Sequence, residues 1–79
     1  MKIVINIQLK EGVLDPQGKA VHHALSALSF AEVDGVRIGK QIVMELSETD
    51  KEKARARVTD MCEELLANTV IENYEIEIA

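Results

Sequence analysis

Apolar and polar side chains alternate along two stretches of the chain, and this is the pattern of β-strands with one buried face. The first stretch runs from Lys2 to Lys10 and the last from about Glu72 to Ile78. Period-two alternation with many β-branched residues predicts a half-buried strand in each. The inward positions are Ile3, Ile5, Ile7 and Leu9 in the first stretch and Tyr74, Ile76 and Ile78 in the last.

A third alternating stretch lies in the middle of the chain, and it is interrupted once. Its apolar positions share one parity, and the exception is Lys40, which follows Gly39. The stretch forms either one long strand that bends at this point or two short strands that meet in a turn. A glycine inside a strand pattern is typical of a β-bulge, so we favour the long bent strand. The apolar positions are Val36, Ile38, Ile42, Met44 and Leu46.

Two segments between the strands have helical spacing. The first is expected from Pro16 to Ser29, because Asp15 can cap its amino end and proline is favoured at a first helical position. The second is expected to follow Thr49, which has capping-box spacing to Glu52. The predicted buried faces are Val21, Leu25 and Leu28 in the first helix, and Ala54, Val58, Met61, Cys62, Leu65 and Leu66 in the second, which ends near Ala67.

These elements predict a single domain over residues 1–79, with the order strand, helix, strand, helix, strand. One apolar face on each element predicts an α+β two-layer sandwich, with both helices on one face of a small, mainly antiparallel sheet. A sheet of so few strands leaves edges exposed, and a chain this short has a small core. We therefore expect a homodimer or a larger assembly.

The composition argues against several classes of partner. Nine basic and fourteen acidic residues give a net charge of −5, and residues 60–79 carry six acids and no base. A nucleic-acid-binding protein normally has a basic patch that neutralises phosphates, so no nucleic acid is expected. No apolar run approaches the roughly 20 residues of a membrane span, so no membrane is expected either. The cytoplasm is the expected location.

The residues that most often carry catalysis or metal binding are poorly placed for either. His22 and His23 are adjacent, so on a helix they point in different directions and cannot share a metal ion. Cys62 is the only cysteine and falls on an apolar helical face, where it reads as a small core residue. The paired carboxylates Glu63-Glu64 and Glu75/Glu77 fall on outward positions, where they lack the burial that acid–base catalysis needs. We expect no catalytic, cofactor-binding or metal-binding residues.

Two motifs remain as candidate partner interfaces. The segment Gly12 to Gly18, with Asp15 and Pro16, forms either a preshaped docking loop or only a strand-to-helix turn. The segment GVRIGK (Gly35 to Lys40) lacks the spacing of a phosphate-binding loop. Its cations contact a partner or are solvated, and the residues alone do not decide. The candidate interface residues are Lys10, Gly12, Asp15, Pro16, Gly18, Arg37 and Lys40.

Three segments closely resemble one known family, the small PurS subunit of phosphoribosylformylglycinamidine synthase. They are LKEGVLDPQGKAV (Leu9 to Val21), GVRIGK (Gly35 to Lys40) and MCEELLANTVIENYEIEI (Met61 to Ile78). The resemblance is collinear over the whole chain. One departure is Thr69, where the family often has proline.

This resemblance implies a role in de novo purine (IMP) biosynthesis. It implies a non-catalytic assembly subunit that dimerises, bridges a glutaminase subunit and an ATP-dependent synthetase subunit, and supports ammonia transfer between them. The complex would use ATP with magnesium and glutamine, while this chain would bind no cofactor itself. The residues alone also allow another function, a free-standing ferredoxin-like domain that senses a metabolite at a dimer interface.

Overall fold

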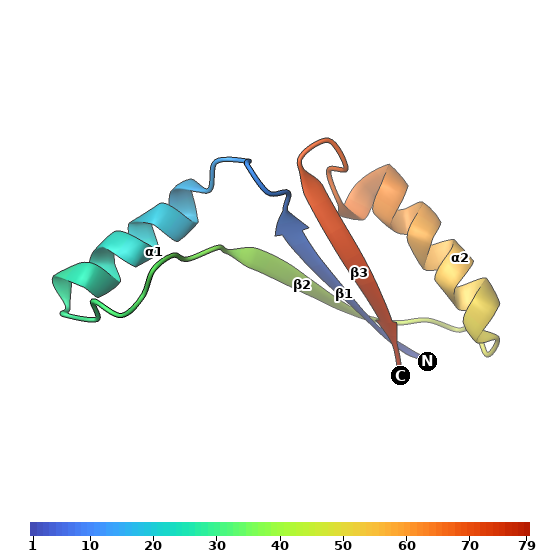
Figure 1. Ribbon diagram of the computed structural model, residues 1–79. Helices are drawn as coiled ribbons and strands as arrows, with labels where there is room; N and C mark the ends of the chain where they lie inside the picture. Colours follow the sequence, from blue (N-terminus) through green and yellow to red (C-terminus); the bar gives the residue numbers. More distant parts are fainter.

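The computed structural model describes residues 1–79 as one sheet with two helices (Figure 1). The predicted order and the α+β class are confirmed. The elements are β1 (Lys2–Leu9), α1 (Pro16–Ala27), β2 (Gly39–Glu45), α2 (Lys51–Met61), a π-helical extension of α2 called η1 (Cys62–Leu66), and β3 (Glu72–Ile78).

The three strands form an antiparallel sheet in the order β2-β1-β3. Ile5 in the central strand lies opposite Ile42 of β2 and Ile76 of β3. This register places the inward positions of all three strands on one face, as the alternation predicts. The two chain ends meet at one end of the sheet, where the Ala79 amide donates to the Lys2 carbonyl at 3.1 Å.

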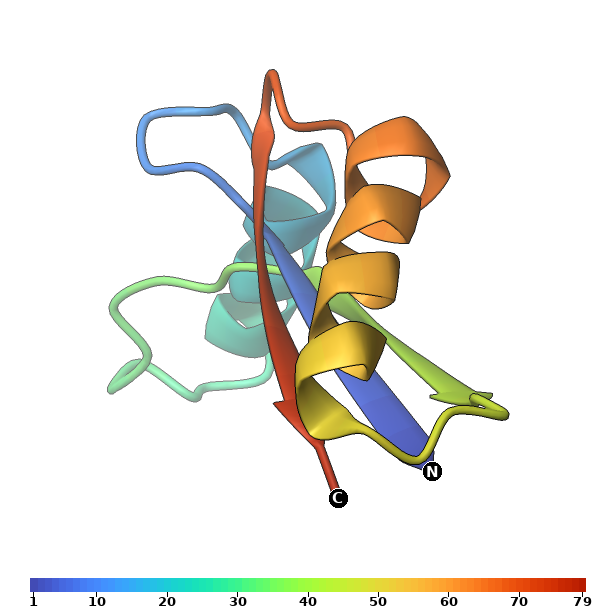
Figure 2. The ribbon, with the colours of Figure 1, turned by 90° about the vertical axis from the view of Figure 1, so that its right-hand side faces the viewer.

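The core lies between the sheet and α2, which packs on the β3 side (Figure 2). Burial of one large aliphatic side chain stabilises a fold by roughly 1.5–3 kcal/mol, so the three central isoleucines supply much of the driving force. Cys62 is fully buried, as expected of a small core residue. The buried apolar residues are Ile3, Ile5, Ile7, Ala54, Val58, Cys62 and Ala67.

The first helix does not lie on the sheet, which corrects the prediction that both helices cover one face. It extends beyond the ends of the strands as an arm, so the molecule measures 49 × 25 × 14 Å (Figure 1). Gln8 and Gly39 form the last pair between β1 and β2, and the chain then leaves the sheet on both sides. Only Gly18 of α1 is buried.

The middle strand is shorter than predicted. It begins at Gly39, and Val36 to Ile38 run toward it without a strand partner, because β1 has already ended at Leu9. The amide of Ile38 donates instead to the carboxylate of Asp15. The polar interruption at Gly39 and Lys40 therefore marks the start of the strand.

The second helix differs from the prediction at both ends. Its cap is Asp50 rather than Thr49, and the Asp50 carboxylate accepts from the amides of Glu52 and Lys53 at 2.9 and 3.2 Å. At the other end, the Ala67 amide donates to the carbonyl of Cys62, five residues earlier, at 3.0 Å. This wider turn buries Ala67 and leaves Leu65, predicted to be buried, 82% exposed.

Candidate functional site

The predicted interface residues gather at the junction between the α1 arm and the sheet, and Asp15 is at its centre. One carboxylate oxygen of Asp15 accepts from the Gly18 amide at 2.8 Å, which caps α1 as predicted. The other oxygen accepts from the Ile38 amide, also at 2.8 Å. Asp15 therefore ties the start of α1 to the segment that leads into β2.

The same contacts keep Asp15 charged. The amides of Ile38 and then Gly18 hold the pKa of its carboxyl below the usual value, because hydrogen bonds to the ionised form favour that form. The positive charge of the Arg37 guanidinium also lowers the pKa of this carboxyl, by less than either hydrogen bond. A charged carboxylate with both oxygens paired serves to fix the backbone.

Arg37 forms its hydrogen bonds on the side of the junction opposite to Asp15. Its guanidinium donates to the carbonyl of Val13 at 2.9 Å and to the carbonyl of Lys10 at 3.2 Å. It thereby holds the loop after β1 against the segment before β2. The sequence left Arg37 as either a partner contact or a solvated cation, whereas the structure gives it this internal role.

Two of the predicted glycines are required by the backbone of the junction. Gly12 has a φ of +85°, which glycine adopts without strain. Gly18 lies so close to the Val36 carbonyl and the Asp15 carboxylate that a β-carbon would overlap both. Pro16 occupies the first position of α1, as predicted.

We expect Gly18→Ala to loosen the α1 arm and leave the sheet intact. Overpacking at a tight contact costs roughly 1–3 kcal/mol. Hydrogen exchange of the α1 amides should therefore become about 5- to 150-fold faster, while the β1 amides keep their protection. Gly35→Ala is the matched control, because a β-carbon there meets nothing within 4 Å. Equal α1 protection in the two variants would contradict the assignment.

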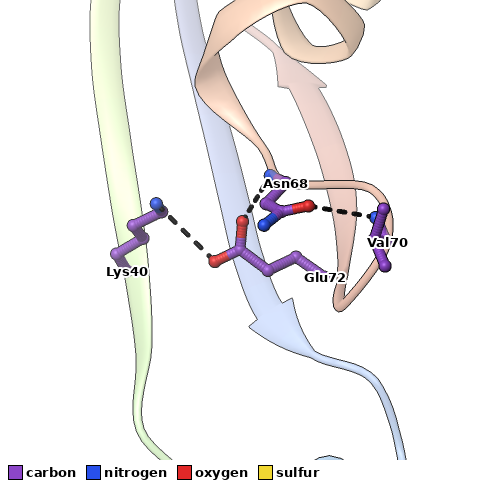
Figure 3. Close-up of polar contacts among 4 residues, drawn as sticks. All are labelled: Lys40, Asn68, Val70 and Glu72. Atoms are coloured by element: carbon purple, nitrogen blue, oxygen red, sulfur yellow. Dashed lines mark hydrogen bonds and ion pairs between the residues drawn. The ribbon is translucent and has the colours of Figure 1, made fainter.

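Lys40 contributes a charge to the inner face of the sheet. Its Nζ lies 3.6 Å from an Oε2 carboxylate oxygen of Glu72, which reaches it from β3 across β1 (Figure 3). The other Glu72 oxygen accepts from the amide of Asn68 at 2.6 Å. The pair closes one side of a hollow of about 410 Å³ between the sheet and the start of α1. Its lining is Ile7, Leu9, Asp15, Pro16, Gln17, Ile38, Gly39, Lys40 and Glu72.

Glu72 and His22 are residues of this region that the sequence analysis did not single out. Glu72 has the inward parity of Tyr74, so it places a charge on the apolar face of β3. Lys40 does the same on β2, and these two opposite charges could have indicated the ion pair. The sequence excluded His22 only from a metal site shared with His23; in the structure it is half-buried, and its Nε2 donates to the Val33 carbonyl at 2.9 Å. No local pattern indicates that contact, which spans the turn after α1.

Away from the junction, Tyr74 donates its hydroxyl hydrogen bond to the Glu63 carboxylate at 2.7 Å. This bond, followed by burial and by the carboxylate charge, raises the pKa of Tyr74 to about 12. The neutral phenol is thus favoured in the folded chain. Its contribution to stability is present below the unfolded value of 10 and is lost as pH rises through about 12.

Because Tyr74 is the only tyrosine, phenolate absorbance reports its titration alone. We expect a midpoint near 12 in the folded chain, with circular dichroism recorded at each pH to show that the fold persists. Glu63→Gln should move the midpoint back toward 10, since the carboxylate charge is gone. A wild-type midpoint near 10 would contradict the contact.

The remaining titratable side chains do not converge on a reaction centre. Burial raises the pKa of the Cys62 thiol, which therefore stays protonated at neutral pH. No three His, Cys, Asp or Glu side chains are grouped to hold a metal ion. No helix has the length and apolar character needed to cross a bilayer. What the junction does is hold α1 in a fixed direction.

The α1 arm presents an apolar face that this chain does not cover. Val21, Leu28 and Phe30 are all exposed, and Leu28 is 68% exposed. The predicted stripe of α1 is present as a pattern, but this chain leaves its residues Val21 and Leu28 exposed. Exposed apolar patches are common at sites of protein association.

Comparison with known proteins gives a consistent result over nearly the whole chain. Residues 2–79 match the model of the PurS family, described as phosphoribosylformylglycinamidine (FGAM) synthase. Subunit PurS of this synthase from Bacillus subtilis is 48% identical over 77 residues, which are 98% of this chain and 90% of the relative.

Solved structures agree in fold. A crystal structure of Bacillus subtilis PurS has a TM-score of 0.86 at 49% identity, covering 96% of this chain and 94% of that one. The PurLQS structure from Thermotoga maritima has a TM-score of 0.88 at 38% identity, covering 96% of this chain and 93% of the matched chain. The arm and the short sheet are therefore features shared with these relatives.

Proposed function

This chain belongs to the PurS family of phosphoribosylformylglycinamidine synthase subunits, and we propose that it is the part that assembles this enzyme of purine biosynthesis. In this role it bridges the glutaminase and synthetase subunits and carries out no chemistry of its own. The observation that carries the proposal is the α1 arm, which extends away from the sheet (Figure 1) and leaves large apolar side chains exposed. A relative in the PurLQS structure supports it.

Bridging matters because two half-reactions must be coupled. Glutamine releases ammonia at one subunit, and ATP with magnesium activates the amide of formylglycinamide ribonucleotide at another. Ammonia that escapes into water is diluted and protonated. A subunit that fixes the two active sites close together raises the local ammonia concentration, and this proximity supports its transfer.

The charged side chains of the junction fit a scaffold. The Asp15 carboxylate and the Arg37 guanidinium form hydrogen bonds with backbone groups, and Lys40 forms an ion pair with Glu72. Such contacts fix the direction of an arm and leave no group poised as a nucleophile or base. We therefore propose that the candidate interface residues support docking by shaping the junction. They are Lys10, Gly12, Asp15, Pro16, Gly18, Arg37 and Lys40.

We assign the α1 face to a second copy of this chain. The inner face of β2 is incompletely covered, because α2 packs on the β3 side and leaves Ile42, Met44 and Leu46 half-buried. The α1 helix of a second copy, laid beside α2, would cover this strip. Each sheet would then carry two helices on one face, and a homodimer would result.

The other partners follow from the charge and the family. We propose that the complex uses ATP with magnesium and glutamine and that this chain itself binds none of them. A net charge of −5 disfavours nucleic acid, and the cytoplasm is the proposed location. The 410 Å³ hollow lies at the α1 junction, where a second copy or another subunit can cover it.

Reconstitution tests the bridging role. The purified glutaminase and synthetase are assayed with ATP and either glutamine or ammonium chloride, with and without this chain. Glutamine-dependent synthesis should require the chain, while ammonium-dependent synthesis by the synthetase should not. Equal glutamine-dependent rates with and without the chain would contradict the proposal.

A further inference from the structure

The strand order β2-β1-β3 places β3 at an outer edge of the sheet. The amide of Ala79 donates to the Lys2 carbonyl at one end of β3, and the amide of Lys10 donates to the Ile71 carbonyl at the other. Bonded and non-bonded pairs alternate in an antiparallel ladder, so the odd-numbered residues of β3 bond to β1. The backbone groups that face away from the sheet are the amides and carbonyls of Tyr74, Ile76 and Ile78.

A row of unpaired amides and carbonyls is a template on which a strand of another molecule can add. In this chain, a side chain of α2 occupies the middle of that row. The Arg55 guanidinium donates to the Ile76 carbonyl at 3.3 Å. Because α2 packs on the β3 side of the sheet (Figure 2), a strand that paired with β3 would have to displace this guanidinium.

Two acidic side chains on the outer face of β3 add a second obstacle. Glu75 and Glu77 are exposed there. The only ion pair of the chain joins Lys40 and Glu72, so both exposed glutamates are without a cationic partner. In a two-fold symmetric pair of β3 strands, an axis at Ile76 would set Glu75 opposite Glu77, and an axis at either glutamate would set it opposite its own copy. Like charges directly opposite each other destabilise a strand pair.

We infer that Arg55, Glu75 and Glu77 keep the β3 edge closed to other copies of this chain. Arg55 occupies a free carbonyl of the edge, and the two glutamates repel a second β3 strand. An assembly formed through the α1 face then has no β3 edge on which further copies can add. The inference concerns this chain alone, and it holds whether or not the chain bridges two other subunits.

Hydrogen exchange of the wild-type chain at micromolar concentration tests whether the edge is free. The amides of Tyr74, Ile76 and Ile78 face no acceptor within the chain. They should exchange at least about tenfold faster than the amides of Glu75 and Glu77, which bond to β1. Equal protection of the two sets would show that another chain pairs with β3, and the inference would be wrong.

Removal of the three side chains tests their role. In Arg55→Ala/Glu75→Gln/Glu77→Gln, copies of the chain should pair along β3, so light scattering should give about twice the wild-type mass or more. The three outward amides of β3 should become protected at the same time. If this variant does not fold, the exchange pattern of the wild-type chain decides the question by itself.

The matched control is Arg57→Ala/Glu11→Gln/Glu64→Gln, which makes the same change in net charge at exposed positions outside β3. It should keep the wild-type mass. An unchanged mass in the β3 variant, or an equal rise in the control, would overturn the inference. A rise without protection of the outward amides would place the contact elsewhere and would overturn it as well.

Discussion

Leu28→Asp is expected to convert the assembled chain into a monomer. Leu28 is 68% exposed on the α1 arm, and the proposed dimer buries it once in each copy. Loss of two buried leucine side chains costs roughly 3–6 kcal/mol, which raises the dissociation constant by about two to four powers of ten. A charge placed in an apolar contact adds a desolvation penalty. Light scattering across micromolar concentrations measures the change.

The control for this prediction lies on the same helix. His23→Asp adds the same charge change on the face away from the stripe, so its mass should equal that of the wild type. Circular dichroism should show the same helix content in both variants. If Leu28→Asp keeps the wild-type mass, the α1 face is not the self-association surface.

Ile5→Ala is expected to abolish most of the folding stability. Ile5 is fully buried at the centre of β1, between Ile42 and Ile76 on the neighbouring strands. Truncation of a buried isoleucine to alanine costs roughly 2–5 kcal/mol, because a cavity is left behind. A chain of 79 residues has only about 4–12 kcal/mol in total on the usual scale per residue.

Urea unfolding followed by circular dichroism measures this loss. The midpoint should fall sharply in Ile5→Ala, and a large unfolded fraction is expected in buffer alone. Val43→Ala, on the exposed outer face, should change the free energy of unfolding by less than about 1 kcal/mol. Similar midpoints in the two variants would mean that the core is not centred on β1.

The sheet could be predicted because each strand carries its own signal. Alternation in β1 and β3 reports which side is buried, and the outcome does not depend on distant parts of the chain. The Asp15 cap could be predicted for the same reason, since it acts within three residues. Such local rules placed the ends of β3 and the start of α1 correctly.

The position of α1 could not be predicted from its pattern. The stripe with Val21 and Leu28 indicates that one face becomes covered, but it does not say whether the cover comes from the same chain. The direction of the arm depends on long-range contacts of Asp15 with Ile38 and of Arg37 with Lys10. A pattern of apolar positions contains no information about those contacts.

The π-helical turn was missed for a related reason. Residues 61–66 have helical spacing, and the pattern places Leu65 with the core. The bond from Ala67 to Cys62 widens the last turn, so that Ala67 takes the inward position and Leu65 turns out.

The central claim is that this chain works through surfaces that other chains cover, starting with the α1 face. The mass of the unmodified chain in solution, from sedimentation equilibrium at micromolar concentration, tests it most directly. One copy has a mass of 8.8 kDa, and the account predicts twice that value or a higher multiple. A stable species of 8.8 kDa throughout the concentration range would contradict it.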